Sequence, residues 1–589
     1  MYILIKSKRK YDYFIIAFQF DEEIVDIVQK IPTSEYIPKM RYWEVRVSRE
    51  TAPHILSLIQ RVDCECSDDV MDRIRGIMRS KNDLLSLSRA LDSYIELPEF
   101  PGDLEPYKFQ KAGVEYMTTA KRCFNGDDMG TGKTIQTLVS MEVGNVYPHI
   151  VICPAVSLDK WRKEAAKWLP HRSTAILDND NFSYGHDIMF VNYEAILKFL
   201  VREIRDPDGS TFKIRNHIKQ IGLKGLTCDE SHRLKNAKNK STRAVKKLAQ
   251  GLEYIWLLSG TIADNRPKEF IPQLQIMRRL NDFGGYTNFI RRYCNSEFEW
   301  NGNVNINGSS NLVELNKKLR QTCMIRRKKS EVLKDLPPKR RHNIYVEIDN
   351  REEYEIASSD IFRWQEENRQ RKQTNLDLFG NIEEKIEHRR MSEDAIELQI
   401  INALRVITAR GKLSSAKKWI RRFLKTGKKL VVFAHHKDIQ YGIINEFPGS
   451  AKIVGGMSKA ERKRNERIFR ESSHCNLIVC SIKSANVTLD LFESHNTLTI
   501  EQAWTASAHD QAEDRVWRMG QKHTCNNYYL LGRNTIDEDM YDLIGSKRAM
   551  AEASLDGDRS VEEESIYNEL VERLKKKGDI KIPQLNESQ

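Results

Sequence analysis

The feature that most constrains the fold of this chain is the stretch of residues 127–134, which reads DDMGTGKT. Its two glycines allow a tight turn that aims backbone N–H groups into one concavity, and such a concavity suits a phosphate group. Lys133 can reach the terminal phosphates of a nucleotide, and the Thr134 hydroxyl can ligate Mg²⁺. Apolar residues at helical spacing follow the loop, and a helix N-terminus also favours an anion. The predicted nucleotide-binding residues are Asp127, Asp128, Met129, Gly130, Thr131, Gly132, Lys133 and Thr134.

This loop departs from the strict phosphate-loop pattern at one position, because Asp127 stands where the pattern has glycine. A short GxGKT string can also arise by chance in a flexible loop. The motifs in the rest of the chain have to decide between these two interpretations.

Length and charge set broad limits on the fold and on the partners. A chain of 589 residues is too long for one hydrophobic core, and about three or four domains are expected from typical domain size. The chain carries 95 basic and 83 acidic residues, which gives a net charge of +12. This balance favours a polyanionic partner, although a well-solvated surface has the same composition.

The cysteines and the hydropathy pattern indicate in which cellular compartment the protein is expected. Ten cysteines are scattered along the chain, and the close pair Cys64 and Cys66 lacks both the spacing and the second pair that a zinc site requires. Several others end apolar runs and are expected to be reduced core thiols. No stretch resembles a signal peptide or a membrane span. We therefore expect a soluble, cytoplasmic protein that has no membrane partner.

Residues 1–66 are expected to form a small unit of their own. Strand patterns cover residues 13–18 and 42–47, and helical patterns cover residues 21–31 and 52–62. A plain packing module would show the same patterns. Residues 67–100 are charged and are expected to form a helical connector. Gln110 follows, at a place before the phosphate loop where its amide can both donate to and accept from an adenine edge.

The second decisive element is GLTCDESH at residues 225–232, an apolar strand that ends in Asp229 and Glu230. At the carboxyl edge of a parallel sheet, Asp229 can hold the water shell of Mg²⁺ while Glu230 polarises the attacking water. Adjacent acids at a strand end rarely have a purely structural role, because an unpaired buried carboxylate is costly.

Two further apolar runs, at residues 149–154 and 254–258, predict strands that are covered on both faces. The second run delivers three small or polar residues into a turn, namely Ser259, Gly260 and Thr261. Together these patterns predict a doubly wound α/β lobe over residues 101–345.

The remaining chain shows a change of character and then a second α/β pattern. Residues 346–410 are charged and nearly devoid of core-forming periodicity, which predicts a solvated helical insertion or a linker. Residues 411–545 contain three apolar strands separated by helical stretches. They end near QAEDRVWRMGQ, where Arg515 and Arg518 share one face if the segment is helical. Such arginines can bind a γ-phosphate and stabilise charge during its transfer. Residues 546–589 are expected to be a mobile, charged tail.

Taken in order, these motifs resemble those of the Swi/Snf-type ATPases of helicase superfamily two. The resemblance covers residues 101–345 and 405–545 and rests on DDMGTGKT, DESH, LLSGT and QAEDRVWRMGQ. Within that family the chain is similar to the HARP (HepA-related) annealing helicases, through GSSNLVELNKKLR, MIRRKKSEVLKDLPPK, ITARGKL and FAHH. The order of elements in residues 1–66 resembles the HARP domain itself.

The resemblance implies two RecA-like, doubly wound parallel-sheet lobes behind a small α+β DNA-binding domain. It implies an ATP hydrolase that uses Mg²⁺ and moves along double-stranded or forked DNA as a monomeric motor. Such a motor would remodel branched DNA by strand annealing or fork reversal.

The family's functional residues are carried over by position. Gln110 would contact adenine, Lys133 and Thr134 the phosphates and Mg²⁺, Asp229 the metal and Glu230 the attacking water, while Arg515 and Arg518 would be arginine fingers. The turn of Ser259, Gly260 and Thr261 would couple ATP hydrolysis to movement along DNA. The DNA backbone would be contacted by Asn192, Lys235 and Asn236.

Two positions depart from the family pattern, Ile262 where the family has proline and Thr488 where it has glycine. Neither change removes a catalytic group, so we expect activity to survive. A strand-separating DNA or RNA helicase and an ATP-gated DNA clamp with little motor activity are the alternatives. The HARP-like unit disfavours the first, and the intact Lys133, Asp229 and Glu230 disfavour the second.

Overall fold

The computed structural model describes two compact units. The first comprises Met1–Val332 and Ala551–Glu563, and the second comprises Leu333–Met550 and Glu564–Gln589. The description leaves out residues 9–10, 49–50, 178–184, 197–200, 206–210, 216–221, 261–265, 299–303, 307, 361–362, 365–392, 483–488, 490, 557–569, 571–572, 575 and 577–589. Thr261, Ile262 and Thr488 therefore lie outside the described residues. No helix of the described part of the chain is long and apolar enough to cross a membrane.

The first unit begins with a five-stranded sheet in the order β3-β4-β2-β1-β5. Its strands are β1 (Tyr2–Lys8), β2 (Tyr11–Ala17), β3 (Glu35–Ile37), β4 (Tyr42–Arg46) and β5 (Glu65–Cys66), with helices α1 (Glu22–Gln29) and α2 (Thr51–Arg61). Alternation along the strands places Phe14, Ile16 and Val45 on one face, where they pack against the helices. The two predicted strands and two predicted helices are confirmed, and β1, β3 and β5 are additional.

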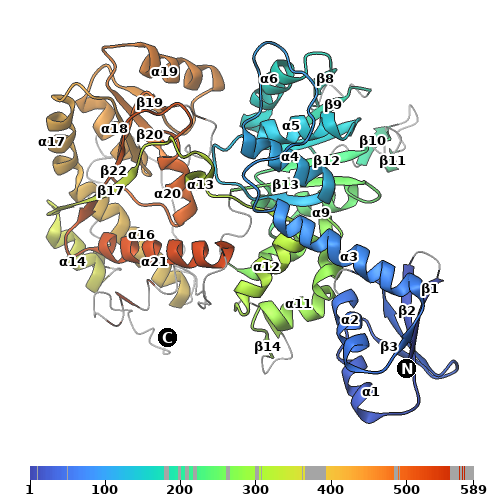
Figure 1. Cartoon of the computed structure of the whole chain (residues 1–589). Helices are drawn as coiled ribbons and strands as arrows, with labels where there is room; N and C mark the ends of the chain where they lie inside the picture. The colour runs from blue at the N-terminus through green and yellow to red at the C-terminus, as the bar shows by residue number, and fades with distance from the viewer. Residues whose placement is uncertain are drawn as a thin grey trace. The chain divides into compact units, whose positions relative to one another are not determined.

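Helix α3 (Asp68–Leu87) belongs to two hydrophobic cores at once. Near its start, Val70 and Ile74 pack into the core of the N-terminal sheet. Near its end, Leu84 packs into the core of the lobe that follows. Figure 1 shows α3 running from the N-terminal sheet to helix α12 (Leu312–Thr322), with which it is in contact.

The rest of the first unit is built on a seven-stranded parallel sheet in the order β16-β6-β13-β12-β7-β9-β8. Its strands are β6 (Arg122–Asn125), β7 (His149–Cys153), β8 (Thr174–Ile176), β9 (Ile188–Asn192), β12 (Gly225–Asp229), β13 (Tyr254–Leu258) and β16 (Met324–Ile325). The helices are α4 (Lys108–Ala120), α5 (Lys133–Val143), α6 (Leu158–Trp168), α9 (Lys240–Leu248), α10 (Phe270–Ile276), α11 (Gly285–Tyr293) and α12. Every residue of β7 is buried, as a strand covered on both faces requires.

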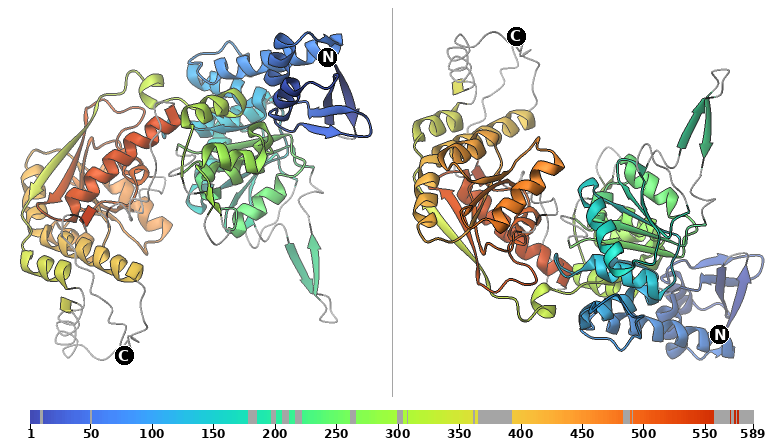
Figure 2. Two further views of the ribbon diagram at one scale, coloured as in Figure 1. Left: turned by 90° about the horizontal axis from the view of Figure 1, so that it is seen from below. Right: turned by 90° about the horizontal axis from the view of Figure 1, so that it is seen from above.

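Two small hairpins accompany this sheet. One pairs β10 (Val201–Arg205) with β11 (Thr211–Arg215), and Figure 2 shows it as a separate two-stranded ribbon. The other pairs β14 (Glu297–Phe298) with β15 (Val304–Asn305).

The second unit contains a six-stranded parallel sheet in the order β17-β22-β21-β18-β20-β19. Its strands are β17 (Lys339–Val346), β18 (Leu430–Ala434), β19 (Ala451–Ile453), β20 (Leu477–Ser481), β21 (Asn496–Thr499) and β22 (Cys525–Gly532). Its helices are α14 (Arg351–Ser359), α16 (Glu393–Gly411), α17 (Leu413–Leu424), α18 (Lys437–Glu446), α19 (Lys459–Glu471), α20 (Ala506–Glu513) and α21 (Ile536–Asp556). The short helix α13 (Lys329–Val332) ends the first stretch of the first unit. The sequence pattern ended the first lobe at residue 345, yet β17 pairs with β22 in the second sheet.

The charged stretch around residues 350–400 contributes more to the core than its pattern predicted. Tyr354 and Ala357 of α14 and Ile400 of α16 pack with α21 in one buried cluster. Leu570 of the C-terminal stretch joins the same cluster. The prediction of a purely solvated insertion is therefore wrong at both of its ends, because widely spaced apolar residues meet only after the helices pack.

Candidate nucleotide-binding site

The order of strands in the first parallel sheet brings three of the predicted motifs together. The phosphate loop follows β6, the SGT turn follows β13, and the acid pair ends β12. β13 lies between β6 and β12, and all three strands run parallel. Their carboxyl ends therefore share one edge of the sheet, which is where α/β sheets place their ligand sites.

The phosphate loop turns at two glycines, and the position of Gly132, just before α5, accepts only glycine. Gly130 and Gly132 have φ values of 79° and 81°, and Gly132 caps the N-terminus of α5. A Cβ on Gly132 would lie 2.3 Å from Nε2 of Gln110. Both the left-handed backbone and this close approach exclude larger residues.

Lys133, the first residue of α5, holds the loop that precedes it. Its Nζ donates to the backbone carbonyls of Asp127, at 2.6 Å, and Asp128, at 3.0 Å. Burial lowers the pKa of Lys133, and the carboxylates of Glu230 and Asp127 only partly offset this effect. A lysine that binds carbonyls in this way is available to exchange them for phosphate oxygens.

Gln110 lies in the first turn of α4 and binds the backbone on both sides. Its Oε1 accepts from the N–H of Tyr107 at 3.0 Å, and its Nε2 donates to the carbonyl of Thr131 at 3.0 Å. The predicted adenine-binding residue is thus attached to the phosphate loop itself. Each end of the amide keeps capacity for one more hydrogen bond.

Asp229 and Glu230 end β12 in two different environments. Burial raises the pKa of Asp229 to about 6, and the neighbouring charge of Glu230 adds to the shift. The indole of Trp161 donates to Oδ2 of Asp229 at 2.9 Å. Trp161 is itself a buried core residue, and no local sequence signal connects it with a strand so far along the chain. Glu230 has a φ of 53°, which turns its side chain out of the strand direction.

His232 links the acid pair to the SGT turn. Its Nδ1 lies 3.4 Å from Oε2 of Glu230 and 3.1 Å from Oγ of Ser259. Gly260 accepts a hydrogen bond from Arg326, and a Cβ on Gly260 would lie 3.0 Å from the side chain of Met129. Ser259 thus contacts the segment of the acid pair and Gly260 lies beside the phosphate loop, while their coupling role stays a prediction.

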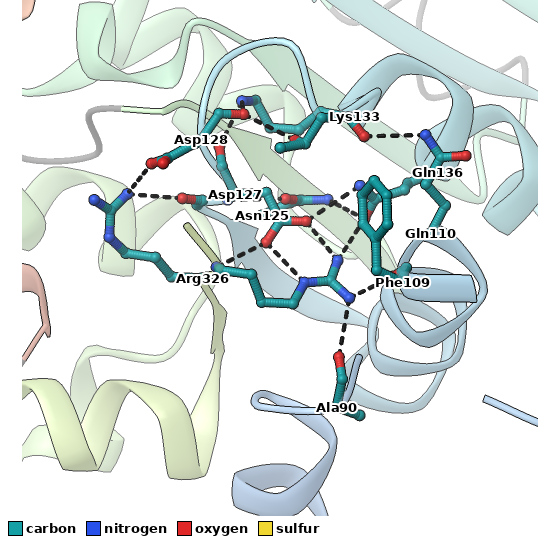
Figure 3. A network of polar contacts seen from close by, with 12 residues as sticks. Ala90, Phe109, Gln110, Asn125, Asp127, Asp128, Lys133, Gln136 and Arg326 are labelled. Carbon is teal, nitrogen blue, oxygen red and sulfur yellow. Dashed lines mark hydrogen bonds and ion pairs between the residues drawn. The ribbon is translucent and has the colours of Figure 1, made fainter. Parts of the chain in front are cut away.

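A buried ion network behind the phosphate loop was missed by the sequence analysis (Figure 3). Arg327 and Asp127 form an ion pair at 2.5 Å, with side chains that are 1% and 0% exposed. Burial raises the pKa of Asp127, but the Arg327 guanidinium outweighs this effect and holds the pKa below its usual value. Asp127 therefore offers its carbonyl to Lys133 and its carboxylate to Arg327.

The two predicted arginine fingers lie in the second unit, after a helix. Helix α20 ends at Glu513, so Arg515 and Arg518 do not share a helical face. Nε of Arg518 donates to the carbonyl of Asp514 at 3.2 Å. Burial lowers the pKa of Arg518 to about 10, so the guanidinium stays charged at neutral pH.

The three residues proposed for DNA contact all have local partners. Oδ1 of Asn192 accepts from the N–H of Ala195 at 2.6 Å. Nζ of Lys235 lies 3.7 Å from Glu269, and Oδ1 of Asn236 accepts from the N–H of Lys238 at 2.9 Å. The contacts of Lys235 and Asn236 shape the segment after the acid pair, and the contact of Asn192 shapes the turn after β9.

The residues at this sheet edge fit a nucleotide with Mg²⁺. Among the described residues, no group of three or more His, Cys, Asp or Glu side chains could hold a metal ion alone. Mg²⁺ usually binds one or two carboxylates, several waters and the substrate phosphates. Thr134 and Asp229 supply a hydroxyl and a single carboxylate of that kind, and the glycine turn supplies N–H groups for phosphate.

Comparison with known protein families matches two successive stretches of the chain. The SNF2-related domain matches residues 109–391, and the helicase conserved C-terminal domain matches residues 412–520. These two domains define a helicase-like protein with paired α/β lobes. The chain is therefore similar to the SNF2-related, helicase-type ATPases over both of these stretches.

The chain is also similar to individual proteins. The SWI/SNF-related matrix-associated actin-dependent regulator of chromatin subfamily A-like protein 1 of Xenopus laevis is 27% identical over 94% of this chain and 54% of its own length. The DNA annealing helicase and endonuclease ZRANB3 of Bos taurus is 26% identical over 83% of this chain and 44% of its own length. The Sulfolobus solfataricus SWI2/SNF2 ATPase core in complex with dsDNA covers 79% of this chain, with 22% identity, 96% of its own length and a TM-score of 0.36. The chain spans about half the length of the first two relatives.

Proposed function

We propose that this protein is a DNA-dependent ATPase that translocates on double-stranded DNA and remodels branched DNA by strand annealing or fork reversal. The observation that carries the proposal is the meeting of Lys133, Asp229 and Glu230 at the carboxyl edge of one parallel sheet. The similarity to a protein named as a DNA annealing helicase supports the choice of reaction. We propose a monomeric motor in a compartment that holds DNA.

The chain's own residues would divide the work of hydrolysis. Lys133 would exchange the carbonyls of Asp127 and Asp128 for phosphate oxygens, and Glu230 would orient the attacking water. Thr134 and Asp229 would hold Mg²⁺, which neutralises charge on the phosphates when it is bound. Arg518 and Arg515 would stabilise the charge that develops on the transferred group.

The N-terminal sheet supports a role in binding exposed bases. Its face opposite the helices carries Tyr11 and Tyr13 on β2, opposite Lys6 of β1 and Arg46 of β4. Tyr11 is 46% exposed, and the Arg46 guanidinium lies 3.6 Å from the centre of its ring. Aromatic and basic side chains on an open sheet are the combination that stacks bases and attracts phosphates. Forked DNA exposes such bases at its junction.

The test is the ATP hydrolysis rate of the full chain without nucleic acid and with single strand, duplex, forked DNA and RNA. Salt is held fixed, because phosphate contacts make affinity salt-dependent. The strongest stimulation is expected from forked DNA. Equal stimulation by plain duplex would leave a translocase without fork preference, and stimulation by RNA alone would favour the RNA-helicase alternative.

Point variants separate the parts of this proposal. Arg518→Ala is expected to abolish hydrolysis and leave ATP binding nearly unchanged, and lost ATP affinity with normal turnover would contradict its finger role. Tyr11→Ala is expected to reduce stimulation by the fork more than by duplex, with Tyr94→Ala, which removes a fully exposed tyrosine elsewhere, as the matched control. Hydrolysis without strand annealing would favour the ATP-gated clamp.

A further inference from the structure

One short stretch of chain, residues 326–341, joins the two units and is anchored at both of its ends. It starts directly after β16, the edge strand of the first sheet, and ends inside β17, the edge strand of the second. The division between the units falls within it, between Val332 and Leu333. The stretch is therefore the covalent path from one sheet to the other.

The first anchor follows from the register of parallel strands. β16 pairs with β6 so that Ile325 lies beside Asn125. Beyond these strands the ladder continues, because the N–H of Gly126 donates to Ile325 at 2.7 Å and the N–H of Asp128 donates to Arg327 at 3.1 Å. This register brings Arg327 directly beside Asp127, although the two residues are 200 positions apart.

Arg327 uses its planar fork to hold several elements around the phosphate loop. Its Nη2 and Nε donate to the two carboxylate oxygens of Asp127, at 2.5 and 3.1 Å. It also donates to the carbonyls of Ala90, at 3.2 Å, and Phe109, at the start of α4. A fully buried side chain with these partners is not a DNA contact. It fixes the loop whose carbonyl holds Lys133.

The neighbours of Arg327 extend the same anchor. Arg326 donates to the carbonyls of Gly126, at 2.9 Å, and Gly260, at 3.1 Å, and so joins the phosphate loop to the SGT turn. The backbone N–H of Lys329 donates to Asp128 at 2.8 Å. Charge, backbone register and side-chain hydrogen bonds thus all tie this end of the stretch to the phosphate loop.

The second anchor holds the segment that carries the arginine fingers. Arg341 donates to both carboxylate oxygens of Glu513 at 2.7 Å, and Nζ of Lys339 lies 3.1 Å from the same carboxylate. The indole of Trp517, which lies between the two fingers in sequence, donates to the carbonyl of Pro337 at 2.8 Å. Glu513 immediately precedes the turns that present Arg515 and Arg518.

We propose that this stretch positions the nucleotide-handling groups of both units: Arg327 positions the phosphate loop through Asp127, and Arg341 positions the finger segment through Glu513. The proposal rests on the proposed ATPase function. Under this proposal Arg327 and Arg341 do not touch the nucleotide, and each acts through the carboxylate that it holds. The two anchors have different consequences, because the phosphate loop binds the nucleotide whereas the fingers stabilise charge during transfer.

The experiment measures nucleotide affinity and ATP turnover separately on the full chain. A fluorescent ADP analogue gives Kd without DNA, and steady-state hydrolysis on duplex DNA gives KM and kcat. Asp127→Asn and Arg327→Lys are expected to raise Kd and KM roughly tenfold. Arg341→Met is expected to lower kcat roughly tenfold at an unchanged Kd. The double variant Asp127→Asn with Arg327→Lys is expected to lose no more affinity than the worse single variant, because the two residues act as one unit.

Matched controls distinguish positioning from plain loss of stability. Arg279, in the first unit, donates to the carbonyls of Ala120 and Arg122 and to Asp282, at the opposite end of β6. Lys412, in the second unit, is buried against Asp537 and the carbonyl of Leu530. Arg279→Gln and Lys412→Met are expected to lower Tm and leave Kd, KM and kcat per folded molecule unchanged.

The outcomes separate this inference from the function on which it rests. A wild-type protein that binds the ADP analogue but hydrolyses no ATP with any nucleic acid would overturn the proposed function and leave the first anchor testable by Kd alone. A wild-type ATPase whose Asp127→Asn and Arg327→Lys variants match the Arg279→Gln control in Kd and KM would overturn the first anchor. An Arg341→Met variant with wild-type kcat would overturn the second.

Discussion

Both anchors of the joining stretch hold a carboxylate with basic side chains, but they differ in how far these side chains are exposed to solvent. In the first unit, Arg327 and Asp127 form a single pair that is almost wholly excluded from solvent. In the second unit, Lys339 and Arg341, 18% and 28% exposed, share Glu513 with Asp510 and Asp514 nearby. One anchor is a dry pair and the other is a half-exposed network.

This difference predicts how each anchor fails. Removing the Arg327 side chain leaves the buried Asp127 carboxylate with uncharged donors only, namely Nε2 of Gln136 at 3.2 Å and the backbone N–H of residue 327 at 3.0 Å, and a buried charge without a counter-charge is costly. In the network, Glu513 keeps Lys339 and the hydroxyl of Tyr529, at 2.7 Å, when Arg341 is lost. Burial raises the pKa of Glu513, yet Lys339 and Arg341 outweigh it and hold the pKa far below its usual value. Several weak supports therefore replace one strong support.

The largest effect is expected at the dry pair. Arg327→Met leaves the Asp127 carboxylate buried without its partner and is expected to lower the free energy of unfolding by about 3–5 kcal/mol. Equilibrium unfolding in denaturant measures the change. A loss of less than about 1 kcal/mol would mean that water reaches Asp127 and that the contrast between the two anchors is false.

A smaller effect is expected in the network. Arg341→Met removes charged hydrogen bonds to Glu513 and is expected to cost about 1.5–3 kcal/mol. The same unfolding experiment applies, and the added variant Lys339→Met tests redundancy. The double variant should lose more free energy of unfolding than the two single variants added together, because Glu513 is then left with Tyr529 as its principal partner.

Buried histidines give each unit its own sensitivity to acid. Burial lowers the pKa of His149 in the first unit to about 3 and that of His509 in the second unit to about 4. Between pH 8 and 5 each of these histidines takes up a proton in the unfolded chain but stays neutral in the folded chain. Each therefore lowers the free energy of unfolding by about 2 kcal/mol over this range.

Variants isolate these contributions from the carboxylates. His509→Gln should lose about 2 kcal/mol less than the wild type between pH 8 and 5. Denaturant unfolding at both pH values gives the difference. Parallel pH profiles of variant and wild type would show that His509 is protonated in the folded protein.

The smallest effect is expected at an exposed pair in the first unit. Arg292 and Glu314 are 58% and 40% exposed and form a bidentate contact. Arg292→Met should cost about 0–1 kcal/mol, because water and salt screen the pair. Raising the salt concentration should erase that cost. A cost close to that of Arg327→Met would remove burial as the explanation for the contrast.

The sequence was sufficient for the most buried strands of the first parallel sheet and for the motifs at their ends. β7 and β13 are continuous apolar runs, and a strand covered on both faces has no other pattern. Asp229 and Glu230 could be predicted from their place at the end of the apolar strand β12, and Lys133 from the glycines before it. The spacing of residues around Gly130 and Gly132 also fixed the turn.

The anchors could not be predicted, because they depend on strand pairing between distant parts of the chain. RRKK at residues 326–329 has the composition of a solvated, DNA-facing segment. Only the two-residue strand β16 beside β6 turns Arg327 inward to Asp127. The aspartate that departs from the phosphate-loop pattern is the partner of that arginine. The pattern alone offered no reason for the departure.

Helix α3 sets a limit on how this protein can be recombined. Its first turns belong to the N-terminal sheet and its last turns to the motor lobe. The backbone just beyond it is held by Arg320 at Ser88 and by Arg327 at Ala90. A chimera that exchanges residues 1–66 alone would cut through a shared core. A graft that carries α3 and the turn to Ala90 keeps the core of the N-terminal sheet whole and has to match the surfaces of α4 and α12 and the guanidinium of Arg327.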